Sequence, residues 1–400
     1  MLMIHQADPV MKRIETLDDY QRAALKTDQN EETGLDGLPF FLLGLFGEVG
    51  TLLSALKKKQ RDRQSYVGYD EAVIEEFGDS LWYFSIIAWR ASLKLSHLAQ
   101  KSFRDLKDWE RVSDRSLETF DGIQRDRNQR GSPDSQQFES ALISLAGHVG
   151  VLLHDLDLKK FATNRDALSA LLINIFKALI NAANVADISL RECAEANVKK
   201  TQNRWPEKHV YTPLFDDRNE PLERFPRKIE MHIFEIKKGG KTHVIQRCNG
   251  INIGDLLTDN KMQPDDYRFH DAFHLAYVAT LGWSPVLRGL FKLKRKSDPK
   301  IDENQDGQRA ILIEEGVTAL IFQRALRLNY FEDINQLDYP LLKIIPEFVA
   351  GYEVEKCPLW QWEEAILAGY AAFRKLRQYR GGIVTADLNK RKLSFRELPR

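Results

Sequence analysis

Hydrophobic residues recur with helical spacing through the first two hundred positions. The segment LPFFLLGLFGEVGTLLSALKKK (38–59) has a broad apolar face and ends in lysines, and a helix C-terminus attracts cations. The segment YDEAVIEEFGDSLWYFSIIAWRASL (69–93) carries acids in its first turns and an apolar stripe after them, as is typical of a helix start. We therefore predict two helices here, joined by a polar loop.

A second set of helical segments follows in the same order. Before it, residues 111–138 lose the apolar periodicity and gather Ser, Asp, Gly and Pro, which predicts a linker. The phrase LFGEVGTLL (45–53) returns one hundred positions later as LAGHVGVLL (145–153), with the polar positions changed. This repeated pattern favours a duplicated fold in which only the first copy kept its chemistry.

The pattern changes after Pro206. The segment KIEMHIFEIKKGGKTHVIQRC (228–248) alternates and contains Gly-Gly, which predicts a β-hairpin, and further helical segments follow it. We expect a mainly α fold, with tandem helical bundles that form a fused pseudo-dimer and a mostly helical C-terminal domain with a small β-hairpin. The expected boundaries are a first repeat over 1–110, a linker over 111–138, a second repeat over 139–206, a linker over 207–228 and a C-terminal domain over 229–400.

Composition narrows the class of protein. Hydrophobic residues make up 43% and charged residues 29%, as in ordinary globular proteins. Lys+Arg and Asp+Glu both total 58, so net charge gives no argument for binding to nucleic acid or membranes. Three widely spaced cysteines favour reduced thiols, and we recognise neither a signal peptide nor an apolar run of membrane-helix length, so we expect a cytoplasmic protein.

Three carboxylates of the first repeat are candidates for a cation site. Glu76 and Asp79 are three apart and share a helix face, and Glu48 lies on the preceding helix. If the two helices pack side by side, these like charges require a bound cation or a raised pKa, and oxygen ligands suit Mg²⁺ or Mn²⁺. The alternative is that they are only the charged first turns of a solvated helix.

These residues also resemble a known family. GEVG (47–50) followed by EEFGDSLWYF (75–84) is similar to the all-α nucleoside triphosphate pyrophosphohydrolases of the MazG type, whose hallmark is Glu-Glu-x-x-Glu, a spacer and Glu-x-x-Asp. The resemblance implies that Glu48, Glu76 and Asp79 bind Mg²⁺ and that the enzyme releases a nucleoside monophosphate and pyrophosphate. Gly47 and Thr51 depart from the pattern, because the family usually has Glu at both positions.

The second repeat carries none of these carboxylates, but it ends in AEANVKKTQNRWP, which resembles the closing motif Asn-x-x-Lys-x-x-x-Arg-x-Pro of the family. That resemblance implies phosphate binding by Asn197, Lys200 and Arg204, which the spacing places along one helical face. We expect a site made by both repeats, with Glu75 orienting the attacking water and Lys58 attracting the triphosphate. The alternative is that these basic residues bind no phosphate and only interact favourably with the helix dipole at the C-terminal end.

The third domain contains a second candidate cluster. RFHDAFHLA places His270, Asp271 and His274 within about one helical turn, and ILIEEGVTALIF carries Glu314 and Glu315 ahead of an apolar stripe. Histidines with a carboxylate can bind a transition metal, although two histidines on one helix face are common without one. We keep His270, Asp271, His274 and Glu315 as a secondary site.

The sequence leaves three hypotheses open. The first is a Mg²⁺- or Mn²⁺-dependent hydrolase acting on a nucleoside triphosphate, with a homo-oligomer left open. The second is a degenerate, nucleotide-sensing protein that acts through its third domain, which the Thr51 departure favours. The third places the chemistry in the His270, His274 and Glu315 set, regulated by the first half.

Overall fold

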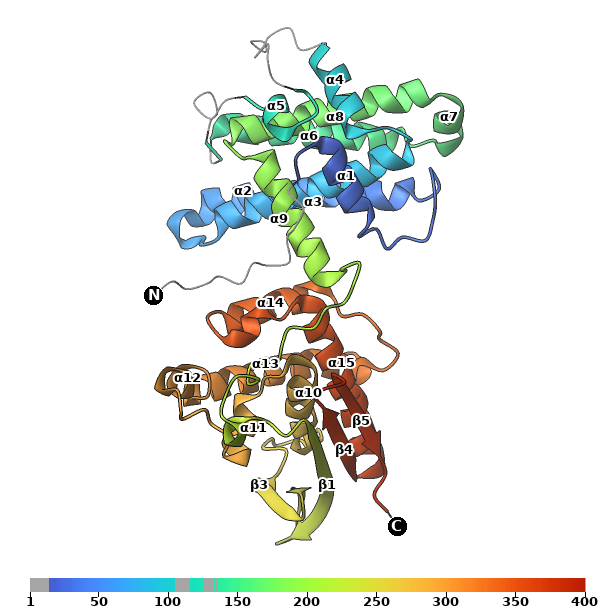
Figure 1. The fold of residues 1–400 in the computed structure, drawn as a ribbon. Helices are drawn as coiled ribbons and strands as arrows, with labels where there is room; N and C mark the ends of the chain where they lie inside the picture. Colours follow the sequence, from blue (N-terminus) through green and yellow to red (C-terminus); the bar gives the residue numbers. More distant parts are fainter. Residues whose placement is uncertain (1–13, 105–115, 126–131, 134, 400) are drawn as a thin grey trace. The chain divides into compact units, whose positions relative to one another are not determined.

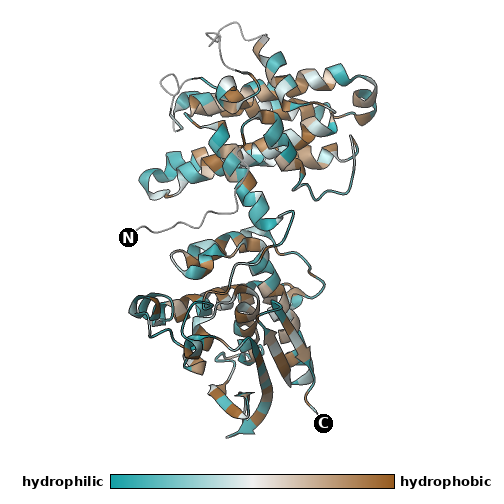
Figure 2. Cartoon of the chain, in the orientation of Figure 1, coloured by the Kyte–Doolittle hydropathy of each residue, from teal (hydrophilic) through white to brown (hydrophobic). Residues whose placement is uncertain are grey.

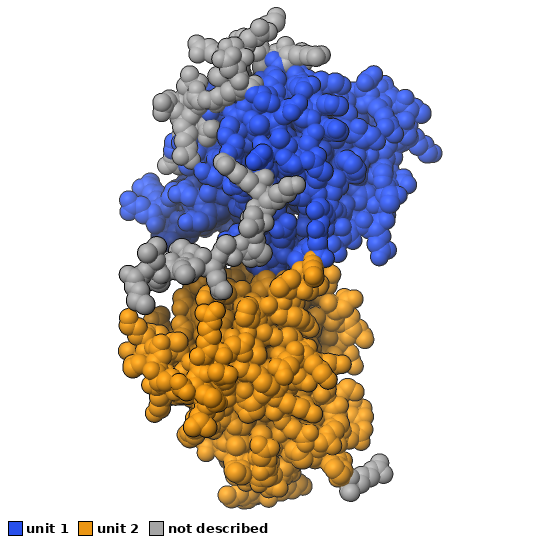
Figure 3. All heavy atoms as spheres, in the orientation of Figure 1, with its two compact units in different colours: residues 1–207 blue, residues 208–400 orange. Residues whose placement is uncertain are grey.

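The protein is described from a computed structural model that covers residues 14–104, 116–125, 132–133 and 135–399 (Figure 1). Contacts divide the chain into two compact units, residues 1–207 and 208–400 (Figure 3), and each unit is described by itself. Part of the predicted linker, 111–115, 126–131 and 134, lies outside the described residues.

The described part of the first unit consists of helices and the loops that join them. Several helices begin where the sequence supplies a cap: the side chains of Ser135, Asn164 and Ser189 accept hydrogen bonds from backbone N–H groups of the first turn. The elements are α1 (Leu17–Leu25), α2 (Leu38–Asp62), η1 (Arg63–Ser65), α3 (Tyr69–Arg90), α4 (Leu95–Arg104), α5 (Phe120–Ile123), α6 (Gln136–His154), α7 (Leu158–Thr163), α8 (Arg165–Val185) and α9 (Leu190–Arg204).

One hydrophobic core runs through both halves of this unit. Helix α2 packs on α3, α6 packs on α8, and α2 also packs on α6. Aromatic rings join the halves: Phe84 of α3 stacks on Phe176 of α8, with ring centroids 5.1 Å apart, and Phe77 of α3 stacks on Phe138 of α6 at 6.2 Å. The first and second predicted repeats therefore share a single hydrophobic core.

The second unit combines helices with a five-stranded antiparallel sheet in the order β3-β2-β1-β4-β5. Its elements are η3 (Pro221–Glu223), β1 (Lys228–Lys238), β2 (Lys241–Cys248), β3 (Ile251–Leu257), η4 (Tyr267–Phe269), α10 (Asp271–Leu281), α11 (Pro285–Phe291), α12 (Pro299–Asn304), α13 (Gln308–Leu326), η5 (Asn329–Phe331), α14 (Tyr339–Val349), η6 (Glu353–Lys356), α15 (Leu359–Tyr379), β4 (Gly381–Asp387) and β5 (Lys392–Arg396).

The predicted hairpin is present, and it is part of a larger sheet than expected. Strands β1 and β2 turn at Gly239 and Gly240, whose φ angles of 59° and 75° suit glycine. The hairpin is extended by β3 on one side and by β4 and β5 on the other. Strand β4 is buried along most of its length, so its sequence GGIVTAD lacks the alternation that identifies a half-exposed strand.

The mainly α fold is confirmed, and its helices combine hydrophobic and hydrophilic residues (Figure 2). Among the described residues, two helices are long and apolar enough to cross a membrane by length and composition alone, Leu38–Ser65 and Arg165–Val185. Both contribute to the core of the first unit, and core helices of globular proteins meet the same criterion.

Candidate metal centres

The first candidate centre lies between α2 and α3. Each of Glu48, Glu76 and Asp79 offers one carboxylate oxygen, and these three oxygens lie within 4.8 Å of one another. Glu48 is four positions before the buried Leu52 on α2, and Phe77, beside Glu76 on α3, is also buried. The packing of these apolar faces therefore brings together the three carboxylates that sequence spacing singled out.

Burial changes the acidity of this cluster. It raises the pKa of Glu76 to about 8, and the adjacent Glu48, Asp79 and Glu75 carboxylates act in the same direction. Burial also raises the pKa of Glu48. Among the described residues, Oε2 of Glu76 is buried and has no hydrogen-bond partner. An oxygen-rich site with an orphaned buried oxygen has the donor chemistry of a Mg²⁺ or Mn²⁺ site.

Helix α9 contributes two further side chains to the surroundings of Asp79. The Asn197 amide donates to Oδ1 of Asp79 at 2.8 Å. The Lys200 ammonium forms an ion pair with Asp79 and lies 3.4 Å from Oε1 of Glu75. Burial raises the pKa of Asp79, and Lys200 and Asn197 partly offset that rise. The closing segment of the second predicted repeat thus lies against the carboxylates of the first.

Gly78 allows this approach of the two helices. A Cβ atom at Gly78 would meet the backbone oxygen of Cys193 at 2.8 Å and Cβ of Asn197 at 3.0 Å. A methyl group would therefore push α9 away from α3. The glycine inside the EEFGD motif has a packing role that its place in the sequence alone does not reveal.

Tyr20 is a residue of this site that the sequence did not predict. Its fully buried hydroxyl donates to Oδ1 of Asn197 at 3.1 Å and lies 3.4 Å from the backbone oxygen of Gly78. Tyr20 thereby orients the amide that binds Asp79. It belongs to the short helix α1, whose sequence signals only an N-terminal capping box at Thr16 and Asp19.

The other predicted residues have these surroundings. The Arg204 guanidinium stacks on the Trp205 ring, 4.4 Å from its centroid. Lys58 is exposed ten residues beyond Glu48 on α2, which is about 15 Å along the helix axis. Thr51 is exposed, and its hydroxyl donates to the backbone oxygen of Gly47 at 3.1 Å. Asn197 and Lys200, two members of the predicted phosphate-binding set, contact the carboxylates of the first repeat.

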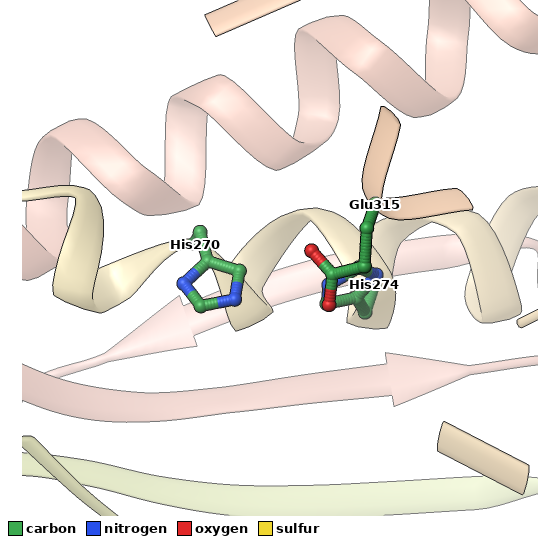
Figure 4. A group of neighbouring side chains, drawn as sticks. All are labelled: His270, His274 and Glu315. Atoms are coloured by element: carbon green, nitrogen blue, oxygen red, sulfur yellow. The ribbon is translucent and has the colours of Figure 1, made fainter. Parts of the chain in front are cut away.

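The second candidate centre lies in the second unit. One ligand atom each from His270, His274 and Glu315 lies within 4.8 Å of the other two. Figure 4 shows His270 just before the start of α10 and His274 on α10, beside Glu315, which belongs to α13. Oδ1 of Asp271 lies 3.7 Å from Nε2 of His270 and 3.8 Å from Nε2 of His274. The structure thus gathers all four residues of the predicted secondary site.

Glu314 supports this centre, a role that the sequence did not assign to it. Its Oε1 lies 2.7 Å from Nδ1 of His274, and it accepts hydrogen bonds from the Ser284 hydroxyl and the Val286 backbone N–H. Burial lowers the pKa of His274, but Glu314 and Glu315 outweigh it and hold the pKa above the ordinary value for a histidine. The only sequence signal was the position of Glu314 next to Glu315.

A family model matches the second unit. Residues 210–399 match the family model of the MazG C-terminal domain, which relates this chain to MazG proteins. The chain is also similar to the Gene 37 protein of Mycobacterium phage L5, with 29% identity over 97 residues, covering 23% of this chain and 85% of that protein. No solved structure matches. The second candidate centre lies within the matched range.

Proposed function

We propose that the first unit is a divalent-cation-dependent nucleoside triphosphate pyrophosphohydrolase. The observation that carries this proposal is the convergence of Glu48, Glu76 and Asp79 within 4.8 Å on two packed helices. The motif resemblance in the first unit and the MazG C-terminal domain match in the second support the same family of activities.

The chain's own residues suggest how hydrolysis would proceed. Glu48, Glu76 and Asp79 would hold the cation, which would neutralise triphosphate charge when bound. Glu75 would orient a water molecule and accept its proton as the water oxygen attacks phosphorus and the bond to the departing pyrophosphate breaks. Lys200, which lies beside both Glu75 and Asp79, would bind phosphate oxygens.

A second candidate function is metal-dependent nucleotide binding without turnover. Thr51 occupies the position of a third motif carboxylate, and its hydroxyl bonds to Gly47 of its own helix. A sensor of this kind would retain the cation and the nucleotide but would lack full acceleration of the chemical step. In either case we propose a cytoplasmic setting, because all three cysteines are buried and free.

The deciding experiment measures monophosphate and pyrophosphate from each common ribo- and deoxyribonucleoside triphosphate with Mg²⁺ or Mn²⁺. Glu76→Gln is the test variant, and Glu71→Gln is the matched control because Glu71 is exposed in the first turn of the same helix. Turnover that Glu76→Gln abolishes and Glu71→Gln retains would support the hydrolase. Cation-dependent nucleotide binding without turnover would support the sensor.

A further inference from the structure

We propose that the second unit contains a transition-metal site, in which Nε2 of His270, Nε2 of His274 and a carboxylate oxygen of Glu315 bind one dication, with Asp271 as a fourth donor. The proposal concerns a different unit and a different set of donor atoms from the proposed hydrolase centre. It does not depend on nucleotide hydrolysis.

Both imidazole rings are held with Nε2 available for a metal. Nδ1 of His270 lies 2.9 Å from the backbone oxygen of Tyr267, and Nδ1 of His274 lies 2.7 Å from Oε1 of Glu314. A carbonyl oxygen and a carboxylate oxygen accept hydrogen bonds, so each Nδ1 donates to its acceptor and each Nε2 faces the proposed ion, which would replace any proton held there. Metal-binding histidines commonly have such an acceptor behind them.

The buried Nε2 of His274 faces two carboxylates. Its side chain is completely buried, and among the described residues its Nε2 has no hydrogen-bond partner. That atom lies 3.5 Å from Oε1 of Glu315 and 3.8 Å from Oδ1 of Asp271. Donors at about 2.1 Å from a tetrahedral ion are about 3.4 Å apart, so these two distances need only a small contraction.

The ring of His270 is also fixed before any ion binds. It stacks on the ring of Tyr267 with centroids 4.5 Å apart and an interplanar angle of 2°. The same residue accepts the Nδ1 hydrogen through its backbone. Tyr267 therefore restrains both the rotation and the tautomer of this histidine, as a preorganised ligand requires.

The donors also select the kind of ion. Two imidazoles with carboxylates suit Zn²⁺, Fe²⁺ or Mn²⁺, whereas Mg²⁺ prefers oxygen ligands. The Glu315 side chain is 37% exposed, so one side of the site remains accessible to solvent. An ion there could keep a position for water or a substrate oxygen, as catalytic metal sites do.

The test uses the full-length chain, freed of metal with a chelator and then dialysed against Zn²⁺ or Co²⁺, with Co²⁺ also serving as the spectroscopic probe. Bound metal is measured by mass spectrometry and visible absorption. We expect about one tightly bound transition ion per chain and Co²⁺ ligand-field bands in the wild type. His270→Gln and Glu315→Gln should each weaken binding at least ten-fold.

Two controls separate this site from other sources of binding. The first control is the double variant Glu48→Gln with Glu76→Gln, which removes two carboxylates of the first unit. The second control is His154→Gln, which removes a histidine whose side chain is 89% exposed. Both should retain the ion. Absence of a tightly bound ion in the wild type would overturn the proposal. So would folded His270→Gln and Glu315→Gln variants that bind the ion as tightly as the wild type. Absence of nucleotide turnover would overturn only the proposed hydrolase.

Discussion

The side-chain amide of Asn197 donates a 2.8 Å hydrogen bond to Asp79, a residue 118 positions earlier in the chain. This bond joins α9, the last helix of the second predicted repeat, to α3, the carboxylate-bearing helix of the first. Lys200, one turn beyond Asn197, forms an ion pair with the same carboxylate. The surroundings of the acidic cluster are therefore supplied by both halves of the first unit.

Replacing Lys200 should affect cation binding and nucleotide binding in opposite directions. The Lys200 ammonium competes with a cation for Asp79, so Lys200→Met should increase affinity for Mg²⁺ in the absence of nucleotide. The same variant should raise KM for a triphosphate about ten-fold, because a phosphate partner is lost. Calorimetry and steady-state kinetics would measure the two effects, with the exposed Lys199→Met as control. Equal behaviour of both variants would contradict this role.

Gly78→Ala should destabilise the first unit. Its new methyl group would lie 2.8 Å from the backbone oxygen of Cys193, so α9 must move away from α3, at a cost of about 1–3 kcal/mol. Gly47→Ala is the matched control, because a Cβ there meets nothing within 4 Å and alanine favours a helix. Urea unfolding should show lower stability for the first variant and unchanged or higher stability for the second. Equal stability would show that α9 tolerates the displacement.

Tyr20→Phe should weaken the support of Asp79 without touching the carboxylates. The change leaves the buried Oδ1 of Asn197 without its donor, which we expect to cost about 1–3 kcal/mol of unfolding free energy. Cation affinity should fall at the same time, because the Asn197 amide is freer to rotate. Equilibrium unfolding and Mg²⁺ titration would measure both quantities. A loss of stability with unchanged cation affinity would limit Tyr20 to a packing role.

The stability of the cation-free protein should fall as pH rises. The pKa of Glu76 is about 8 in the folded state, against an ordinary value of 4.5, so the folded state binds more protons between these values. Stability contributed by protonated Glu76 is present below about pH 4.5 and is lost as pH rises to about 8. Thermal unfolding across this range should show the decline, and Glu76→Gln should reduce it. An unchanged slope in that variant would assign the effect to other groups.

Glu314→Gln should loosen the histidine site of the second unit. The neutral amide removes the charged acceptor behind Nδ1 of His274 and places an N–H group among the donors of Ser284 and Val286. We expect a loss of about 1–3 kcal/mol in stability and a 10–100-fold loss of transition-metal affinity. Glu347→Gln on an exposed face of α14 is the control. Full metal affinity in Glu314→Gln would exclude a supporting role.

Local patterns in the sequence predicted much of the fold but not all of the sheet. The β1–β2 hairpin carries both alternation and the turn residues Gly239 and Gly240, so it could be recognised from one short segment. Strand β4 pairs with β1 from about 150 positions away, at Gly381–Asp387. Its mostly buried residues give no alternating signal, and no local rule identifies a partner so distant in sequence.

Helix periodicity is enough to tell which residues share a helix face. The helical period places Glu76 beside Asp79 and His270 beside His274, and these relations need no tertiary information. Which faces meet depends on how the helices pack in three dimensions. Packing brought Glu48 to the first pair, because contacts between helices depend on buried shape and close approach across long stretches of chain, which local spacing does not encode.

The same distinction explains the phosphate-binding prediction. Asn197, Lys200 and Arg204 have spacings that favour one helical face, and the sequence treated them as one set. In the folded unit, the small Gly78 lets α9 approach α3 where Asn197 and Lys200 reach Asp79, whereas Arg204 at the helix end stacks on its neighbour Trp205. The sequence supplies the side chains that each helix offers. Packing selects which of those side chains come into contact, because van der Waals contact limits how closely two helices approach.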